Sequence, residues 1–218
     1  MLIILLTFTH YSIQNYCVKG GGEMSNIIEK LIAESTDGLV KVTDVEAYGG
    51  DRRALKSYVN NNKLMRVGRG LYQITDQWED DLYILSVKYP KGIVSHETAL
   101  YIHGFTDRTP AIYSFTFPQG YNAPSLKNEN VIIKRVVQEK YSLGLSDALS
   151  FSGNPIRVYN IERTLCDIVR GEGSDIQIVL DAMKRYAKYE NKNINLLMDY
   201  AEQLHVKKKI LRYMEVLL

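Results

Sequence analysis

Residues 39–75 read LVKVTDVEAYGGDRRALKSYVNNNKLMRVGRGLYQIT, and this stretch determines the fold class that the sequence predicts. Apolar side chains recur at helical spacing in two short segments, which predicts helices at 42–48 and 51–60. Gly49 and Gly50 lie between them and allow a sharp turn. The pattern therefore indicates two helices joined by a tight turn.

A hairpin is predicted directly after the second of these helices. Two strands are expected at 64–67 and 71–75, joined by Gly68-Arg69-Gly70, whose glycines allow the positive φ that a tight hairpin needs. An amphipathic helix at 25–35 precedes the whole stretch, with Asp37-Gly38 ending it. This order of elements is typical of a winged helix-turn-helix.

The predicted helices have distinct inner and outer faces. Thr43 is expected to cap the helix at 42–48, with Val45 and Tyr48 facing the core. In the helix at 51–60 the apolar face consists of Leu55, Tyr58 and Val59. Its opposite face consists of Arg52, Arg53, Lys56 and Asn60.

The charge of this stretch suggests nucleic acid as its partner. It holds seven basic and three acidic residues between Lys41 and Thr75, although the whole chain has a net charge of only +2. In a helix-turn-helix the second helix, here the one predicted at 51–60, can enter the major groove. Basic residues near it and at the hairpin tip can bind phosphates. The candidate DNA-binding residues are Arg52, Arg53, Lys56, Asn60, Lys63, Arg66 and Arg69. The alternative is a winged helix that contacts protein, with these charges solvated.

The length of 218 residues suits one or two domains. Cys17 and Cys166 are far apart and have no metal spacing, which fits a reducing cytoplasm. The apolar segment LIILLTF at 2–8 is too short to span a membrane. Met24 is expected to be the native start of the protein. The expected divisions are a non-native or disordered extension at 1–23, a winged helix at 24–75, a linker helix at 76–92 and a further domain at 93–218.

The region after the linker is predicted to be a mixed α/β domain that ends in a helical bundle, so the fold class is α+β. Ser95 is expected to cap a helix that ends at His103-Gly104. Strands are expected at 111–118, 130–138 and 155–160, and Asn160 is expected to cap the first of the closing helices.

Two polar groups in this region invite a catalytic interpretation. Ser95, His96 and Glu97 are successive residues, and the side chains of neighbours on one helical turn do not converge as those of a catalytic triad must. We therefore prefer the interpretation that Ser95 caps the helix. The segment Glu162–Asp167 is interpreted as an internal network that includes Arg163, with a binding or catalytic site as the alternative. Cys166 is expected to be a buried, inert thiol.

No phosphate-binding loop, dinucleotide fingerprint, metal motif or kinase signature is present in the sequence. We therefore assign no catalytic, cofactor-binding or metal-binding residue, expect no cofactor, and do not expect an enzyme. The closing helices carry a basic face that is either merely solvated or binds RNA, DNA or an acidic partner. Its residues are Lys184, Arg185, Lys188, Lys207, Lys208, Lys209 and Arg212.

The chain resembles the AbiEi antitoxins of type IV toxin–antitoxin systems from residue 24 to the end. The motifs that carry the resemblance are Arg69-Gly70-Leu71-Tyr72, VSHETALYIHG from Val94, the Pro118-Gln119-Gly120-Tyr121 turn and IERTLCD from Ile161. The resemblance implies a cytoplasmic antitoxin of an abortive-infection system used in phage defence, whose winged helix binds inverted repeats in its own promoter and represses the operon. It also implies that the domain at 93–218 counteracts a nucleotidyltransferase-type toxin without a stable complex.

The resemblance makes the basic face of the closing helices the candidate for antitoxicity, through RNA or another anionic target. Two alternatives remain open. One is an enzyme that modifies the toxin or reverses its product, and the other is a plain winged-helix regulator whose second domain senses a ligand. The operator sequence, the neutralising mechanism and the oligomeric state are not encoded in any pattern that we recognise.

Overall fold

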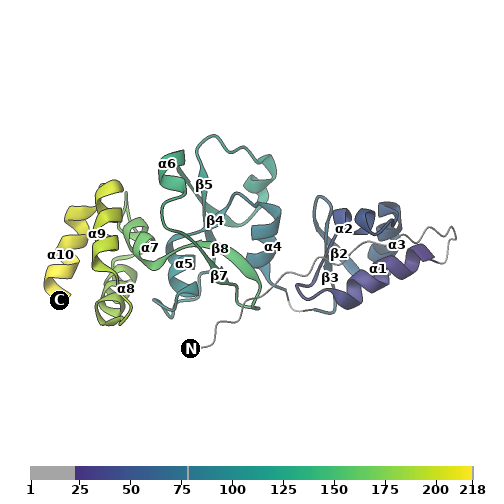
Figure 1. Cartoon of the computed structure of the whole chain (residues 1–218), viewed down its shortest axis with the longest axis horizontal. Coiled ribbons are helices and arrows are strands. Elements are labelled where there is room, and N and C mark those ends of the chain that lie inside the picture. The colour runs from purple at the N-terminus through teal and green to yellow at the C-terminus, as the bar shows by residue number, and fades with distance from the viewer. Residues whose placement is uncertain (1–22, 78, 218) are drawn as a thin grey trace, which may run out of the picture. The chain divides into compact units, whose positions relative to one another are not determined.

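The computed structural model describes residues 23–77 and 79–217 (Figure 1). It divides into two compact units: the first holds the described residues up to Arg66 together with Gly70–Asp76, and the second holds Val67–Arg69 and the described residues from Gln77 onward. The predicted extension lies outside the described residues except for Glu23, which begins the first helix. Helices and sheets are both present in the chain, and the predicted α+β class is confirmed.

The first unit is a winged helix. Its elements are α1 (Glu23–Glu34), β1 (Leu39–Lys41), α2 (Val42–Ala47), the 3-10 turn η1 (Arg52–Ala54), α3 (Leu55–Asn60), β2 (Leu64–Gly68) and β3 (Leu71–Ile74). The sheet order is β1-β3-β2, with β1 antiparallel to β3 and Leu39 opposite Gln73. Strand β1 was not predicted, because a strand of three residues leaves too little pattern to recognise.

The core of this unit forms where the three helices cover the sheet. Ile28, Val45 and Leu55 come from the helices, and Val40 and Leu64 come from the strands; all five are buried. The predicted inner faces are therefore largely confirmed.

Two predictions about α2 are wrong. Tyr48 is 59% exposed, because it lies at the C-cap of the helix, where its ring is 5.8 Å from Nζ of Lys30. Thr43 lies inside the helix and caps nothing. Lys41 is the N-cap residue, with no side-chain cap bond.

The lack of a side chain at Gly50 allows the turn to lie close to α2. A Cβ at this position would lie 2.8 Å from Cγ1 of Val45 and 3.0 Å from the carbonyl oxygen of the same residue. We expect Gly50→Ala to lower the free energy of unfolding by about 1–3 kcal/mol, since overpacking displaces the backbone. Thermal denaturation measures this. Gly49→Asn is the control, because Gly49 has open space around it and Asn tolerates its φ of +81°.

The second unit is built on a mixed sheet. Its elements are α4 (Asp81–Lys88), β4 (Ile93–Val94), α5 (His96–Ile102), β5 (Tyr113–Pro118), the 3-10 turn η2 (Pro124–Asn128), β6 (Val131–Val136), α6 (Gln138–Tyr141), β7 (Leu145–Leu149), β8 (Pro155–Tyr159), α7 (Ile161–Ile168), α8 (Ile176–Lys188), α9 (Ile194–Gln203) and α10 (Lys207–Leu217). The strand order is β6-β5-β4-β8-β7. Strands β4 and β7 were not predicted.

Both parallel and antiparallel pairs occur in this sheet. Strand β4 is antiparallel to β5 and parallel to β8, β5 is parallel to β6, and β7 is antiparallel to β8. Helix α4, which was expected in the linker, packs against β8, and its cap Asp80 accepts a hydrogen bond from Asn154 at 2.9 Å. Helix α4 thus lies within the second unit.

The closing helices pack around a buried α7. Asn160 caps α7 by accepting a hydrogen bond from the Arg163 amide at 3.0 Å, as predicted. Helix α7 contacts α5, α8 and α9, while α10 packs on α8 and α9 (Figure 1). None of the helices in residues 23–77 and 79–217 combines the length and the hydropathy that a bilayer crossing requires.

Candidate nucleic-acid interface

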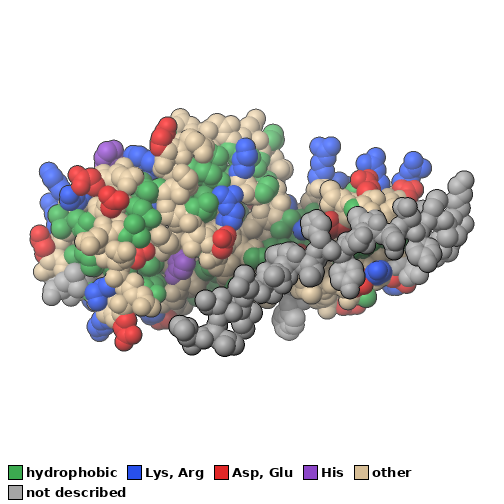
Figure 2. Space-filling model, in the orientation of Figure 1, with side chains coloured by type: hydrophobic (Ala, Val, Ile, Leu, Met, Phe, Trp, Pro, Cys, Tyr) green, Lys and Arg blue, Asp and Glu red, His purple; other side chains and the backbone are tan. Residues whose placement is uncertain are grey.

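The side chains predicted to bind DNA are all exposed, and all of them except Arg69 belong to the first unit. The set comprises Arg52, Arg53, Lys56, Asn60, Lys63, Arg66 and Arg69. Figure 2 shows basic side chains projecting from the part of this unit that carries α2 and α3. Leu55 and Tyr58 on the opposite side of α3 are buried, so the segment has one face in the core and one in solvent.

The predicted continuous helix at 51–60 is instead a 3-10 turn followed by α3. Asp51 caps the turn, because its carboxylate accepts a hydrogen bond from the Arg53 amide at 2.8 Å. Arg52 and Arg53 therefore lie at the N-terminal end of the segment, where residues of a recognition helix contact base edges.

The hairpin presents Arg69 at its tip. Gly70 has a φ of +71°, which meets the predicted need for a positive φ, and its carbonyl accepts a hydrogen bond from the Val42 amide at 2.9 Å. This bond ties the hairpin to the start of α2, while the Arg69 side chain is exposed.

Three of the candidate cations have acidic neighbours. Arg52 lies 3.9 Å from Glu46, Arg53 lies 3.9 Å from Asp51, and Lys63 lies 3.4 Å from Glu29. All of these side chains are well exposed, and exposed ion pairs contribute little to stability. These cations can therefore exchange a carboxylate for a phosphate at small cost.

In the second unit, Arg163 is the centre of the network predicted from the sequence. It is fully buried, and its Nε donates to Oδ2 of Asp167 at 2.9 Å. Its Nη1 donates to the carbonyl oxygens of Lys140 and Leu143, and its guanidinium lies 4.3 Å from the centre of the Tyr159 ring. Glu162 lies outside this network and accepts a hydrogen bond from the Tyr186 hydroxyl at 3.1 Å.

Ser95 does not cap α5 as predicted, although it occupies the N-cap position. Its hydroxyl is buried, accepts a hydrogen bond from Oγ1 of Thr116 at 2.9 Å and lies 3.0 Å from Nδ1 of His96. The tertiary partner on β5 therefore replaces the local cap bond. The buried hydroxyl is also inaccessible to a substrate, which disfavours a Ser95 nucleophile.

Cys166 is buried in α7, as predicted, and burial raises the pKa of its thiol. A protonated, inaccessible thiol is a poor nucleophile. Cys17 lies outside the described residues.

The basic residues predicted on the closing helices fall into two groups. Three of them have partners within the second unit: Arg185 pairs with Asp107, Lys207 lies 2.6 Å from Glu202, and Lys209 donates to the carbonyl oxygen of Val169 at 2.8 Å. The other four are exposed and make no hydrogen bond or ion pair with any residue that the structure describes. They are Lys184, Lys188, Lys208 and Arg212.

A pocket of about 310 Å³ opens beside α7, and sequence reasoning did not predict it. Its polar lining comes from α5, β5, β6, α7 and the loop after α7, so no local pattern could have revealed it. The lining residues are His96, Thr116, Lys134, Arg135, Val136, Asp167, Arg170, Gly171, Glu172 and Gly173. Within the described residues, no cluster of three or more His, Cys, Asp or Glu side chains could hold a metal ion.

The fold and its basic face define a winged-helix protein with an added α+β domain. Residues 28–75 match the model of the family described as transcriptional regulator, AbiEi antitoxin, so the predicted resemblance to AbiEi antitoxins is confirmed over the winged helix. No curated protein sequence matches the chain significantly.

The fold also resembles a solved structure that spans most of the chain. The crystal structure of the RV2827C protein from Mycobacterium tuberculosis superimposes with a TM-score of 0.66 at 11% sequence identity. The match covers 88% of this chain and 76% of that one. At this identity the likeness shows a shared fold and nothing about function.

Proposed function

We propose that this protein is the antitoxin of a type IV toxin–antitoxin system, and that it represses its own operon by binding inverted repeats in the promoter. The observation that carries the first activity is the exposed basic face of α3 and the hairpin, on a unit that matches a family of transcriptional regulators. Arg52 and Arg53 read bases, Lys63 and Arg66 hold phosphates, and Arg69 contacts the minor groove or the backbone.

A reporter gene under the upstream promoter tests repression in cells. Expression of the full chain lowers reporter output, and the Arg52→Ala/Arg53→Ala variant restores it. Equal output with and without the wild-type protein would contradict repression.

We assign the neutralising activity to the second unit, where it opposes a nucleotidyltransferase-like toxin without a stable complex. The basic side chains without internal partners support this assignment, because they are free to bind RNA or another anionic target of the toxin. Lys184 and Lys188 are four residues apart on α8, and Lys208 and Arg212 are four apart on α10, so each pair shares one face of its helix.

Charge reversal at Lys208 and Arg212 is expected to abolish rescue of cells that express the toxin and to leave promoter binding unchanged. The reason is that both side chains are exposed and bind nothing inside the described fold. Colony counts after toxin induction measure rescue. The matched control is Lys207→Glu, which reverses a charge on the same helix as Lys208 but at a residue that already pairs with Glu202 on α9, and it is expected to retain rescue. Full rescue by the Lys208→Glu/Arg212→Glu variant would show that this basic face is not needed to neutralise the toxin.

The pocket beside α7 supports a second candidate, a winged-helix regulator whose second domain senses a small ligand. Expression of residues 77–218 alone in toxin-producing cells distinguishes the antitoxin from the ligand-sensing regulator. Rescue by this fragment supports the antitoxin, whereas no rescue by a fragment that folds, as judged by circular dichroism, supports the regulator.

A further inference from the structure

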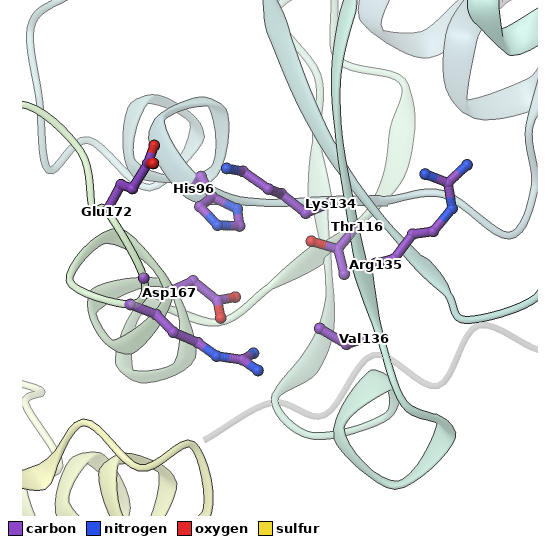
Figure 3. Close-up of a pocket in the computed structure, with 10 residues that line it drawn as sticks. His96, Thr116, Lys134, Arg135, Val136, Asp167 and Glu172 are labelled. Atoms are coloured by element: carbon purple, nitrogen blue, oxygen red, sulfur yellow. The ribbon is translucent and has the colours of Figure 1, made fainter.

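The pocket beside α7 holds a buried carboxylate with an unused acceptor. Asp167 is 2% exposed, and its Oδ2 accepts the bond from Arg163. Its Oδ1 accepts no hydrogen bond from any described residue. Figure 3 shows the carboxylate directed into the space toward Thr116 and Val136. Among the buried side-chain nitrogen and oxygen atoms of the described residues, only Nη2 of Arg163 lacks a partner, so Oδ1 of Asp167 is accessible from the pocket, where water or a ligand can donate to it.

His96 adds a hydrogen-bond donor to the same space. Because Thr116 donates to Ser95, the Ser95 hydroxyl hydrogen is left to donate to Nδ1 of His96. Burial lowers the pKa of His96, which favours the neutral ring, and a neutral ring whose Nδ1 accepts from Ser95 carries its hydrogen on Nε2. Figure 3 shows the ring projecting into the pocket between Lys134 and Asp167.

The backbone of His96 is in an unfavourable conformation. Its φ is +51°, in the left-handed region that non-glycine residues seldom adopt. Such conformations are strained and cluster at functional sites. The first residue of α5 is thus held with its ring in the pocket at the expense of local stability.

Basic side chains also line the pocket. Lys134 on β6 points toward His96, whereas Arg135, the next residue on the same strand, points away from the pocket (Figure 3). Arg170 also lines the pocket, from the residues that follow α7. Lys209 fastens this loop by donating to the carbonyl oxygens of Val169 and Gly171 at 2.8 and 3.3 Å. Glu172 is an exposed carboxylate at the rim.

We propose that this pocket binds a nucleoside 5′-phosphate, with the phosphate on Lys134, Arg170 and His96 and a hydroxyl or amino group of the ligand donating to Asp167. The donors suit a group with several terminal oxygens, and a guanidinium can bind phosphate through two hydrogen bonds. The accessible Oδ1 of Asp167 can accept a hydrogen bond from a donor on the ligand, and ribose and the amino-bearing bases carry such donors. The volume lies at the lower end of the range for small-ligand sites.

Isothermal titration of the full chain with AMP, CMP, GMP and UMP tests the proposal. At least one of them binds with a Kd below about 1 mM, and both inorganic phosphate and the matching nucleoside bind at least about tenfold more weakly. A 5′-phosphorylated dinucleotide then distinguishes a free nucleotide from the end of a nucleic-acid strand, because a strand end gives the tighter binding of the two. Absence of saturable binding by all four nucleotides would overturn the proposal.

Two variants separate the pocket from general electrostatic attraction. Lys134→Ala weakens nucleotide binding by about tenfold or more. Lys127→Ala, which removes the same charge from an exposed residue of η2 that does not line the pocket, changes it less than about twofold. His96→Asn removes the imidazole and keeps a residue type that tolerates positive φ, so the variant folds but binds weakly. Equal losses in the Lys134 and Lys127 variants, or unchanged binding in His96→Asn, would contradict the assignment.

Discussion

Arg163→Ala lowers the free energy of unfolding of the second unit by about 3–5 kcal/mol, the largest effect that we expect of a single substitution. Arg163 is fully buried, and its removal leaves the 2%-exposed Asp167 carboxylate without its partner. The carbonyl oxygens of Lys140 and Leu143 lose their donor at the same time. A buried charge and buried acceptors without partners keep their full desolvation cost.

Hydrogen exchange of amides in α7 measures this effect, because it reports on the second unit without interference from the first. Arg157→Ala is the matched control: its guanidinium donates to the carbonyl oxygen of Pro90 at 3.1 Å from an exposed position, so the loss is under about 1 kcal/mol. A double variant, Arg163→Met/Asp167→Leu, removes both charges and loses less stability than Arg163→Ala alone. Equal protection in the Arg163 and Arg157 variants would show that the buried pair does not stabilise the unit.

The second large effect concerns DNA. Arg52→Ala and Arg53→Ala each weaken binding to the upstream operator by about 1–3 kcal/mol where the side chain makes a bidentate contact with a base. Both side chains extend from the exposed start of the recognition segment. Their ion pairs with Glu46 and Asp51 are exposed and weak, so they do not prevent either arginine from binding DNA. Fluorescence anisotropy with labelled operator duplex measures the loss.

Phosphate contacts have a different signature. Lys63→Ala and Arg66→Ala lower the affinity for every duplex and flatten the dependence on salt, since fewer counterions are released. Lys30→Ala on α1 is the control for loss of charge alone, because Lys30 pairs with Glu34 four residues away. If Arg52→Ala and Arg53→Ala both bind like the wild type, the segment formed by η1 and α3 is not the recognition helix.

The winged helix could be predicted because its determinants are local. The turn depends on Gly49 and Gly50, the hairpin on Gly70, and the helices on apolar spacing that remains visible in a short window. Strand β1 was missed because its three residues become a strand only by pairing with β3, more than thirty positions later along the chain. Tyr48 was misplaced because helical spacing does not show that the helix has already ended.

The second unit was predicted less completely because its features depend on contacts distant in sequence. Serine is a residue type that commonly caps helices, but the hydroxyl of Ser95 instead accepts a hydrogen bond from Thr116 on β5. The basic face of the closing helices was predicted as one surface, yet Arg185, Lys207 and Lys209 use their charges inside the fold. The pocket brings together side chains from separate elements, and only the sheet order places them side by side.

A footprint of the full chain on the DNA upstream of its own gene tests most directly whether the winged helix binds DNA specifically. We predict protection of two inverted half-sites whose centres are separated by a whole number of helical turns, about 10 base pairs each. The Arg52→Ala/Arg53→Ala variant loses this protection, while Lys208→Glu/Arg212→Glu retains it. Protection no stronger than on unrelated DNA of equal length, at the same salt concentration, would contradict the account.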